Sequence, residues 1–289
     1  MSVKGKVAIV TGAGGGLGRC HALLLAEHGA KIVVNDLGGG IDGSGKGDAA
    51  DRVVEEIRSM GGEAVANKAS VADRAGAKSI VDTAVKEFGT VDILVNNAGI
   101  LRDKSFKNMT LDEWDSVINV HLNGSAYVTW HAWPIMYAKN YGRIVLTSSV
   151  SGIFGSFGQA NYGAAKMGMV GMMNNLCREG AGHNVFVNCL SPGATTRMTA
   201  SVPGATTDPD NPDPENHPAL VSPAVLFMCS EDAPNGKIIQ AMGGKYSVQQ
   251  VFTNDGIDLG VSATYEDLDA RRETLLDMSK AHANSRYGQ

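Results

Sequence analysis

Short apolar runs alternate with amphipathic stretches along most of this 289-residue chain. The runs are rich in β-branched residues and lie at 6–12, 31–36, 64–70, 91–99, 142–149 and 184–193, with a further one at 237–242. Helical periodicity fills the stretches between them, and the longest helix is predicted from about Leu111 to Ala138. Near-continuous apolar strands that alternate with helices are typical of a parallel sheet covered on both faces. The pattern predicts an α/β fold: a doubly wound (Rossmann) parallel sheet of seven strands with helices on both faces.

Two segments depart from this pattern. Residues from about 197 to 218 are rich in proline, aspartate and asparagine, which excludes a regular helix through them. They follow the carboxyl end of a strand, where open α/β sheets bind ligands, so we interpret them as a substrate lid rather than a plain surface loop. Residues 1–244 are predicted as one domain, and residues 245–289 as a C-terminal helical extension with Thr264 as a helix N-cap. We expect the extension to pack on the domain or on a neighbouring subunit.

Composition and charge argue against several classes of function. The formal net charge of -5 gives no electrostatic reason to expect nucleic acid or an anionic membrane as partner. No apolar run approaches the roughly 20 residues of a membrane span, and the N-terminal stretch lacks the apolar core of a signal peptide. The four cysteines have neither CxxC nor metal-ligand spacing, so we expect reduced thiols and no metal site. These features predict a cytoplasmic protein without a nucleic-acid or membrane partner.

A glycine-rich segment, TGAGGGLG, follows the first strand and opens the first helix. Its glycines Gly12, Gly16 and Gly18 have the spacing GxxxGxG rather than GxGxxG. Either spacing brings backbone close to a pyrophosphate at a helix N-terminus. The strand before it and the helix after it favour a dinucleotide site over a mere tight turn.

Asp36 ends the second strand, 18 residues beyond Gly18. A carboxylate there can accept hydrogen bonds from the adenosine ribose hydroxyls and would repel a 2′-phosphate. Gly15 leaves the glycine loop without a basic side chain for that phosphate. Both features predict NAD rather than NADP as the cofactor, although Asp36 could also be a solvated turn residue.

Tyr162 and Lys166 lie four residues apart in GQANYGAAK, so both leave the same face of a helix. A free tyrosine has a pKa near 10, and a neighbouring ammonium group together with a positive nicotinamide ring would lower it toward that of a useful base. Ser149 ends the fifth strand, where its hydroxyl could hold a substrate oxygen. The Tyr–Lys spacing alone is weak evidence, since such pairs are usually surface neighbours. Chance is a poor explanation once the glycine loop, Asp36 and Ser149 occur in order.

The sequence resembles the short-chain dehydrogenase/reductase family over roughly Gly5 to Gly244. The motifs that carry the resemblance are TGAGGGLG, NNAG at 96–99, Ser149, YGAAK and SPG at 191–193. The resemblance implies that Tyr162 is the acid/base, that Lys166 tunes it and bonds the nicotinamide ribose, and that Ser149 orients the substrate. It also implies a cofactor site made of Gly12, Gly16, Leu17, Gly18, Asp36, Ser70, Val71, Asn97, Ala98, Gly99, Tyr162, Lys166, Pro192, Gly193 and Thr195.

The chain departs from the family pattern at three positions. The helix asparagine of the family is His121 here, and its imidazole either orders a relay water as a catalytic residue or is structural. Asn119 and Asn123 lie about 200° round an ideal helix from His121, so neither substitutes for it. Ser70 stands where the family usually has an aspartate at the adenine, and Arg197 stands in the PGxxxT segment.

Further stretches resemble the dehydrogenase part of the peroxisomal multifunctional enzymes of type 2, also called 17β-hydroxysteroid dehydrogenases of type 4, and their stand-alone bacterial relatives. They include GILRDKSF, VHLNGS, FGQANY and RMT. The resemblance implies NAD-dependent oxidation of a secondary alcohol, a 3-hydroxyacyl-CoA or a steroid side-chain CoA ester, with a free 17β-hydroxysteroid as the alternative substrate.

Ser149, Gln159, Arg102 and Arg197 are the candidate substrate contacts, although the arginines could equally be solvated surface charges. Two rival functions stay open: an NADPH-dependent carbonyl reductase, against which Asp36 argues, and a nucleotide-sensing scaffold that kept the fold. The family's usual four-helix interface implies a homodimer or homotetramer.

Overall fold

The computed structural model describes residues 3–40, 42, 44–45, 47–200, 208–209 and 211–283. The chain divides into two compact units, Met1–Val248 and Gln249–Gln289, which are described separately below.

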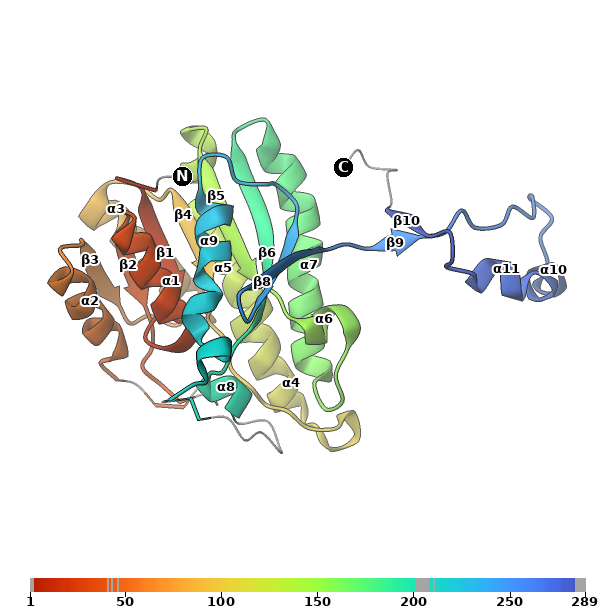
Figure 1. The fold of residues 1–289 in the computed structure, drawn as a ribbon, viewed down its shortest axis with the longest axis horizontal. Helices are drawn as coiled ribbons and strands as arrows, with labels where there is room; N and C mark the ends of the chain where they lie inside the picture. Colours follow the sequence, from red (N-terminus) through yellow and green to blue (C-terminus); the bar gives the residue numbers. More distant parts are fainter. Residues whose placement is uncertain are drawn as a thin grey trace. The chain divides into compact units, whose positions relative to one another are not determined.

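The first unit is built on one eight-stranded sheet (Figure 1). Its strands are β1 (Val7–Thr11), β2 (Lys31–Asn35), β3 (Ala64–Asn67), β4 (Ile93–Asn96), β5 (Gly142–Thr147), β6 (Val185–Gly193), β7 (Ile238–Met242) and β8 (Lys245–Gln249), in the spatial order β3-β2-β1-β4-β5-β6-β7-β8. The first seven pair in parallel. The strand order reverses direction between β1 and β4, which is the point at which such sheets bind ligands beyond their carboxyl ends.

The eighth strand corrects the sequence prediction of seven. β8 follows β7 after Gly243 and Gly244, both of which have positive φ, as the two-residue turns that join hairpin strands require. Residues 245–248 therefore belong to the first unit rather than to the C-terminal extension. The Gly-Gly pair is the local signal for this hairpin.

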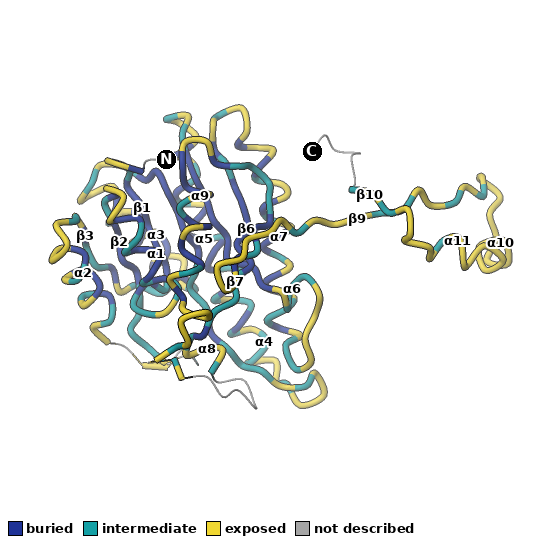
Figure 2. The backbone as a smooth tube through the Cα atoms, viewed as in Figure 1, coloured by how far each residue is buried: buried dark blue, intermediate teal, exposed yellow. Residues whose placement is uncertain are grey.

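Helices cover both faces of the sheet, as predicted. On one face lie α1 (Gly16–Glu27), α2 (Ala49–Ser59) and α9 (Ser222–Cys229), and on the other α3 (Arg74–Phe88), α5 (Gly124–Ala138) and α7 (Ala160–Ala181). β1 shows how a single strand serves both layers: Ala8 and Val10 join the first core, while Val7 and Ile9 join the second. This alternation follows from the two-residue period of a strand. Figure 2 shows the sheet as the buried centre of the unit.

The long helix predicted from Leu111 to Ala138 is interrupted. It comprises α4 (Leu111–Ile118), a π-helical segment (Asn119–Asn123) and α5. The wider π turn contains His121, whose side chain is buried, while Asn123 donates a 2.7 Å hydrogen bond to Asn119 on the exposed side. Single π turns inside α-helices are frequent at functional sites. The two asparagines do not take the place of His121, as the sequence analysis expected.

The predicted lid is described only in part, because residues 201–207 and 210 lie outside the described residues. Its first residues form the short helix α8 (Arg197–Ala200), and 3₁₀ turns follow at Pro214–Asn216 and Pro218–Leu220. The described part therefore has no long regular helix, as its composition predicted.

The second unit contains the helices α10 (Tyr265–Ala270) and α11 (Arg272–Leu276) and a short antiparallel pair, β9 (Phe252–Thr253) with β10 (His282–Ala283). Thr264 caps α10 as predicted, because its hydroxyl accepts a hydrogen bond from the backbone N–H of Asp267. None of its described residues is buried, and Figure 2 shows this part in the colours of exposed and intermediate residues. This unit thus has no core of its own.

Three further features concern the described residues. No helix there is both long enough and apolar enough to cross a membrane. No cluster of three or more metal-binding side chains occurs among them. All four cysteines are free and buried, as their spacing suggested.

Candidate active site

A cavity of about 290 Å³ opens at the carboxyl ends of the strands. The predicted cofactor residues that line it are Gly12, Gly16, Leu17, Gly18, Asp36, Ser70, Val71, Asn97, Ala98, Gly99, Tyr162, Lys166 and Pro192. Gly193 and Thr195 do not line it. Thr195 is buried and its N–H donates to the carbonyl of Asn216, while the next residue, Thr196, reaches the cavity. Parallel strands bring these distant segments to one edge of the sheet.

The glycine loop presents backbone N–H groups at the start of α1. Its N-cap, Gly15, is extended and supplies no side-chain hydrogen bond, so the first N–H groups of α1 have no capping side chain. A Cβ atom on Gly18 would lie 2.6 Å from Nδ2 of Asn97 and 2.8 Å from the carbonyl carbon of Gly12, which explains the glycine there. Uncapped N–H groups at a helix N-terminus suit a phosphate.

Asn97 ties the end of β4 to the end of β1. Its side-chain amide donates to the carbonyls of Thr11 (3.0 Å) and Gly12 (3.1 Å). In return, the hydroxyl of Thr11 accepts from the N–H groups of Asn97 and Ala98. The NNAG segment and the glycine loop therefore hold each other in place.

Asp36 braces the glycine loop as well as lining the cavity. One carboxylate oxygen accepts a 2.8 Å hydrogen bond from the N–H of Gly14, and the other accepts a 2.6 Å bond from the N–H of Gly38. The carboxylate is thereby fixed at the mouth of the cavity, at the end of β2.

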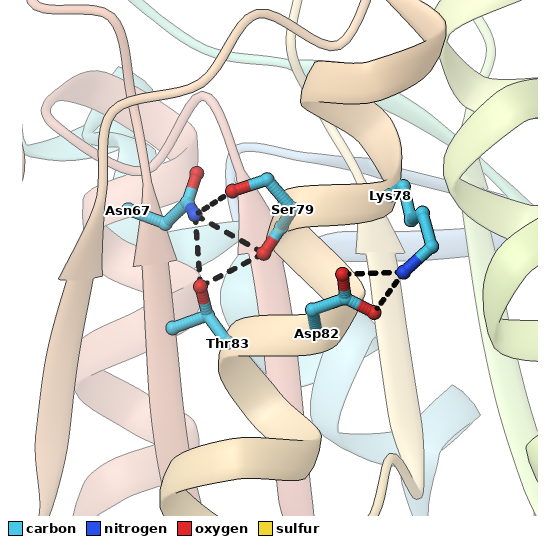
Figure 3. A network of polar contacts seen from close by, with 5 residues as sticks. All are labelled: Asn67, Lys78, Ser79, Asp82 and Thr83. Carbon is cyan, nitrogen blue, oxygen red and sulfur yellow. Dashed lines mark hydrogen bonds and ion pairs between the residues drawn. The ribbon is translucent and has the colours of Figure 1, made fainter.

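A network of polar side chains, which the sequence analysis missed, shapes the segment 69–71 of the cavity wall. Asn67, at the end of β3, donates to the hydroxyl of Thr83 and the carbonyl of Ser79 on α3 (Figure 3). Its amide oxygen accepts from Asn35 (3.0 Å) and from the N–H of Ala69 (2.9 Å). Asn35 also donates to the carbonyl of Ala69. The sequence contained a signal for this network, because Asn35 and Asn67 are the last residues of two otherwise apolar strands.

Ser149, Tyr162 and Lys166 meet beside this cavity. Ser149 is the N-cap of α6 (Val150–Phe154), and its hydroxyl also hydrogen-bonds the phenol of Tyr162. The ammonium group of Lys166 donates a 2.6 Å bond to the carbonyl of Thr147 and lies 5.4 Å from the centre of the Tyr162 ring. Ser148 adds a 2.9 Å bond to the carbonyl of Lys166. The predicted triad is thus assembled by β5 and α7.

Burial governs the protonation of this triad. Removal from water raises the pKa of Tyr162, the bond from Ser149 lowers it, and the carboxylate of Asp103 raises it. Burial also lowers the pKa of Lys166 to about 7. The sequence analysis expected Lys166, together with a bound nicotinamide ring, to lower the pKa of Tyr162. With the protein's own groups alone, desolvation is the largest contribution and raises the pKa, and the effect of Lys166 with a bound nicotinamide stays a prediction.

The π turn places the side chain of His121 beside the ring of Tyr162. Its Nε2 lies 2.8 Å from the carbonyl oxygen and 3.0 Å from the amide nitrogen of Ile100, and its Nδ1 has no hydrogen-bond partner among the described residues. The ring meets that of Tyr162 edge to face, with centroids 5.2 Å apart. Burial, followed by the charge of Lys166, lowers the pKa of His121 well below its usual value, so the imidazole is neutral.

The predicted substrate residues fall into two groups. Arg197 lines the cavity, whereas Ser149, Gln159 and Arg102 lie outside its lining. The amide of Gln159 donates a 2.6 Å bond to Asp103, a partner that the sequence analysis missed.

Asn161 is a second missed residue. Its side chain is fully buried and donates to the carbonyls of Arg102 (3.2 Å) and Glu113 (3.3 Å). These bonds tie the first turn of α7 to the loop after β4 and to α4. Its position before Tyr162 was the available signal.

Comparisons with known proteins agree with this geometry. A family model for short chain dehydrogenases matches residues 6–206. Peroxisomal multifunctional enzyme type 2 of Drosophila melanogaster is 48% identical over 283 residues, which are 96% of this chain and 46% of that enzyme. A hydroxyacyl-CoA dehydrogenase of Mycobacterium tuberculosis is 37% identical over 292 residues, covering 94% of this chain and 90% of its own. The crystal structure of a short chain dehydrogenase from Mycobacterium avium has a TM-score of 0.84 at 41% identity and covers 96% of both chains.

The family resemblance and the α/β fold inferred from the sequence are thereby confirmed. The chain spans about half the length of the Drosophila enzyme and nearly all of the Mycobacterium avium protein. A family model that matches most of the first unit, together with relatives at this level of identity, shows that the chain belongs to the short-chain dehydrogenase family and is an oxidoreductase.

Proposed function

We propose that this oxidoreductase uses NAD to convert the secondary alcohol of a 3-hydroxyacyl-CoA ester into a ketone. The observation that carries the proposal is the meeting of Ser149, Tyr162 and Lys166 beside a cavity lined by the glycine loop and Asp36. A phenol, a hydroxyl and an amine in contact can hold an alcohol oxygen and move its proton.

Each residue has a distinct role in this proposal. Ser149 donates to or accepts from the substrate oxygen and keeps it beside the phenol of Tyr162. Tyr162 accepts the hydroxyl proton in the oxidative direction and returns it in reduction. Bound NAD would supply the acceptor for the hydride that leaves the carbinol carbon. Lys166, anchored on the carbonyl of Thr147, holds positive charge next to the phenolate that forms.

The cavity residues fit NAD. The uncapped start of α1 suits the pyrophosphate, and the carboxylate of Asp36, fixed by Gly14 and Gly38, can accept from ribose hydroxyls. The same carboxylate opposes a 2′-phosphate by like-charge repulsion. NAD is therefore proposed over NADP.

His121 is proposed to take part in proton movement. Nε2 either donates to the carbonyl of Ile100 or accepts from its N–H, and the buried Nδ1 is correspondingly an acceptor or a donor without a partner among the described residues. A neutral imidazole beside Lys166 can order a water that carries the proton away. His121→Ala should lower kcat with NADH binding retained, and His121→Asn should recover part of the loss. An unchanged kcat in His121→Ala would leave it a structural residue.

The substrate class rests on similarity. Relatives named as a hydroxyacyl-CoA dehydrogenase and as a peroxisomal multifunctional enzyme support a CoA thioester over a free steroid. The test is NADH formation at 340 nm with a 3-hydroxyacyl-CoA and with a free 17β-hydroxysteroid at equal concentration. Preference for the thioester supports the proposal, and preference for the steroid contradicts it. Tyr162→Phe should lose about 10²- to 10⁴-fold in kcat while it still binds NADH.

We also propose that two or more copies of the chain associate with one another. The protein is proposed to lie in the cytoplasm. Trp130 on α5 is 71% exposed beside a depression lined by Arg74, Tyr127 and His131, a surface typical of interfaces. The four free, buried cysteines suit a reducing compartment. Trp130→Glu should reduce the mass measured by light scattering, whereas Met60→Glu, at another exposed apolar residue, should not. The C-terminal unit, whose residues up to Ala283 include no buried one, is proposed to pack on the domain or on a second copy.

A further inference from the structure

Arg197 lies against the glycine loop, not at the substrate end of the site. Its Nη2 is 3.6 Å from the position that a Cβ atom on Gly15 would occupy, and Cγ2 of the preceding Thr196 is 3.7 Å from the corresponding position on Gly16. Both side chains line the cavity. The base of the lid thus faces the start of α1.

The guanidinium of Arg197 is also an uncommitted cation. Arg19, on the first turns of α1, is held by both carboxylate oxygens of Glu56, and Lys166 is anchored on Thr147. Within the described part of the chain, no carboxylate or carbonyl accepts a hydrogen bond from the Arg197 side chain. A guanidinium next to uncapped backbone N–H groups makes an anion site with two kinds of donor.

We propose that Arg197 binds the pyrophosphate of the dinucleotide cofactor, and so is a cofactor-binding residue rather than a contact to the substrate's CoA. Gly15 has no side chain, which leaves room for the guanidinium to reach phosphate oxygens above the loop. A 2′-phosphate is the poorer partner, because Asp36 is held at the neighbouring Gly14 and would repel it. This inference rests on the proposed use of NAD.

The test is the dissociation constant of NADH, measured by fluorescence titration without substrate. Arg197→Gln should weaken NADH by about 5- to 20-fold, since it removes charge-assisted hydrogen bonds at a partly exposed site. Arg197→Lys, which keeps the charge and loses the planar fork, should recover only part of the affinity. Arg178→Gln removes the same charge from an exposed position outside the cavity lining and should leave NADH binding within about twofold, as expected for screened distant charges.

Competition experiments show whether Arg197 contacts the pyrophosphate of the cofactor. ADP-ribose, which contains the pyrophosphate, should lose affinity for Arg197→Gln in parallel with NADH, whereas adenosine should not. An unchanged NADH constant, a loss confined to NADPH, or a loss confined to the acyl-CoA would each overturn the role of Arg197. Failure of the wild-type protein to bind NADH would instead overturn the proposed function and this inference together.

Discussion

The imidazole ring of His121 occupies the space that a side chain on residue 99 would need. A Cβ atom added to Gly99 would lie 3.0 Å from each ring nitrogen, closer than non-bonded atoms approach without displacement. Gly99 closes the NNAG segment after β4, and His121 sits in the π turn that interrupts the helix between α4 and α5. The glycine is therefore required by a residue 22 positions further along the chain.

This contact predicts the effect of Gly99→Ala. The new methyl group must push the buried ring away from Ile100 and Tyr162, so we expect a loss of about 1–3 kcal/mol in the free energy of unfolding, typical of overpacking. We also expect a fall in kcat. Urea unfolding and steady-state kinetics measure the two effects.

Gly171→Ala is the matched control. No atom lies within 4 Å of a Cβ added at this helical glycine, so the substitution should be neutral or should stabilise by up to about 1 kcal/mol. Combining Gly99→Ala with His121→Ala should recover stability relative to Gly99→Ala alone. If it does not, the clash with His121 is not the cause.

The buried Lys166 predicts a pH-dependent cost to stability. Its folded pKa, lowered to about 7, lies below that of an unfolded lysine, so between about pH 7 and 10 the unfolded state binds more protons. The cost of burying the charge is fully present below pH 7 and disappears as pH rises. The contribution of Lys166 should therefore rise by up to about 1.4 kcal/mol per pH unit above 7.

Lys166→Met removes this titration. The variant should exceed the wild type in unfolding free energy at pH 6, and the difference should shrink steadily up to pH 9 in urea unfolding. Lys86→Met, at a lysine whose side chain is 82% exposed, is the matched surface control. A constant difference for Lys166→Met would contradict the lowered pKa.

The network around Asn67 predicts a link between a strand end and nucleotide affinity. Asn67→Ala removes one of the acceptors of the buried amide of Asn35 and the bond that holds the N–H of Ala69, so we expect a loss of about 1–3 kcal/mol in stability. Segment 69–71 lines the cavity, and NADH should therefore bind more weakly while kcat at saturation is retained.

The pair Lys78–Asp82, also drawn in Figure 3, provides the control. Both side chains are well exposed, and Lys78→Ala should change stability by less than about 0.5 kcal/mol. Equal effects of Asn67→Ala and Lys78→Ala on NADH affinity would count against the positioning role of Asn67.

The carboxylate of Asp36 leads us to predict that the protein binds NADH more tightly than NADPH. Asp36→Asn removes the charge that opposes a 2′-phosphate, so the ratio of NADPH to NADH affinity should rise by about 10- to 100-fold. An amide has only one acceptor oxygen for the N–H groups of Gly14 and Gly38, so NADH itself should bind somewhat more weakly. Fluorescence titration with both nucleotides measures the ratio. Asp51→Asn, on the exposed face of α2, should leave it unchanged.

Local sequence patterns were sufficient to predict the α/β architecture and the positions of the main candidate site residues along the chain. Near-continuous apolar runs and helical periodicity predicted the seven parallel strands and the covering helices, and residue type predicted the cap at Thr264. The sequence analysis missed the edge strand β8 because it is short and exposed, with only Tyr246 and Val248 apolar, although the preceding Gly-Gly turn signalled it. The single helix predicted after Leu111 missed the π turn, because one extra residue in a turn leaves no trace in periodicity.

By itself, the sequence determined the glycine loop, Asp36, Ser149, Tyr162 and Lys166 as candidate site residues, since each depends on residue type next to a strand end or on one helix face. Only the tertiary structure decided what surrounds them: the neutral His121 on Gly99, the buried amine of Lys166, and Arg197 against Gly15. These relationships join segments far apart in the chain, and burial depends on all of them at once. Desolvation and steric fit are properties of the packed molecule, which local sequence does not encode.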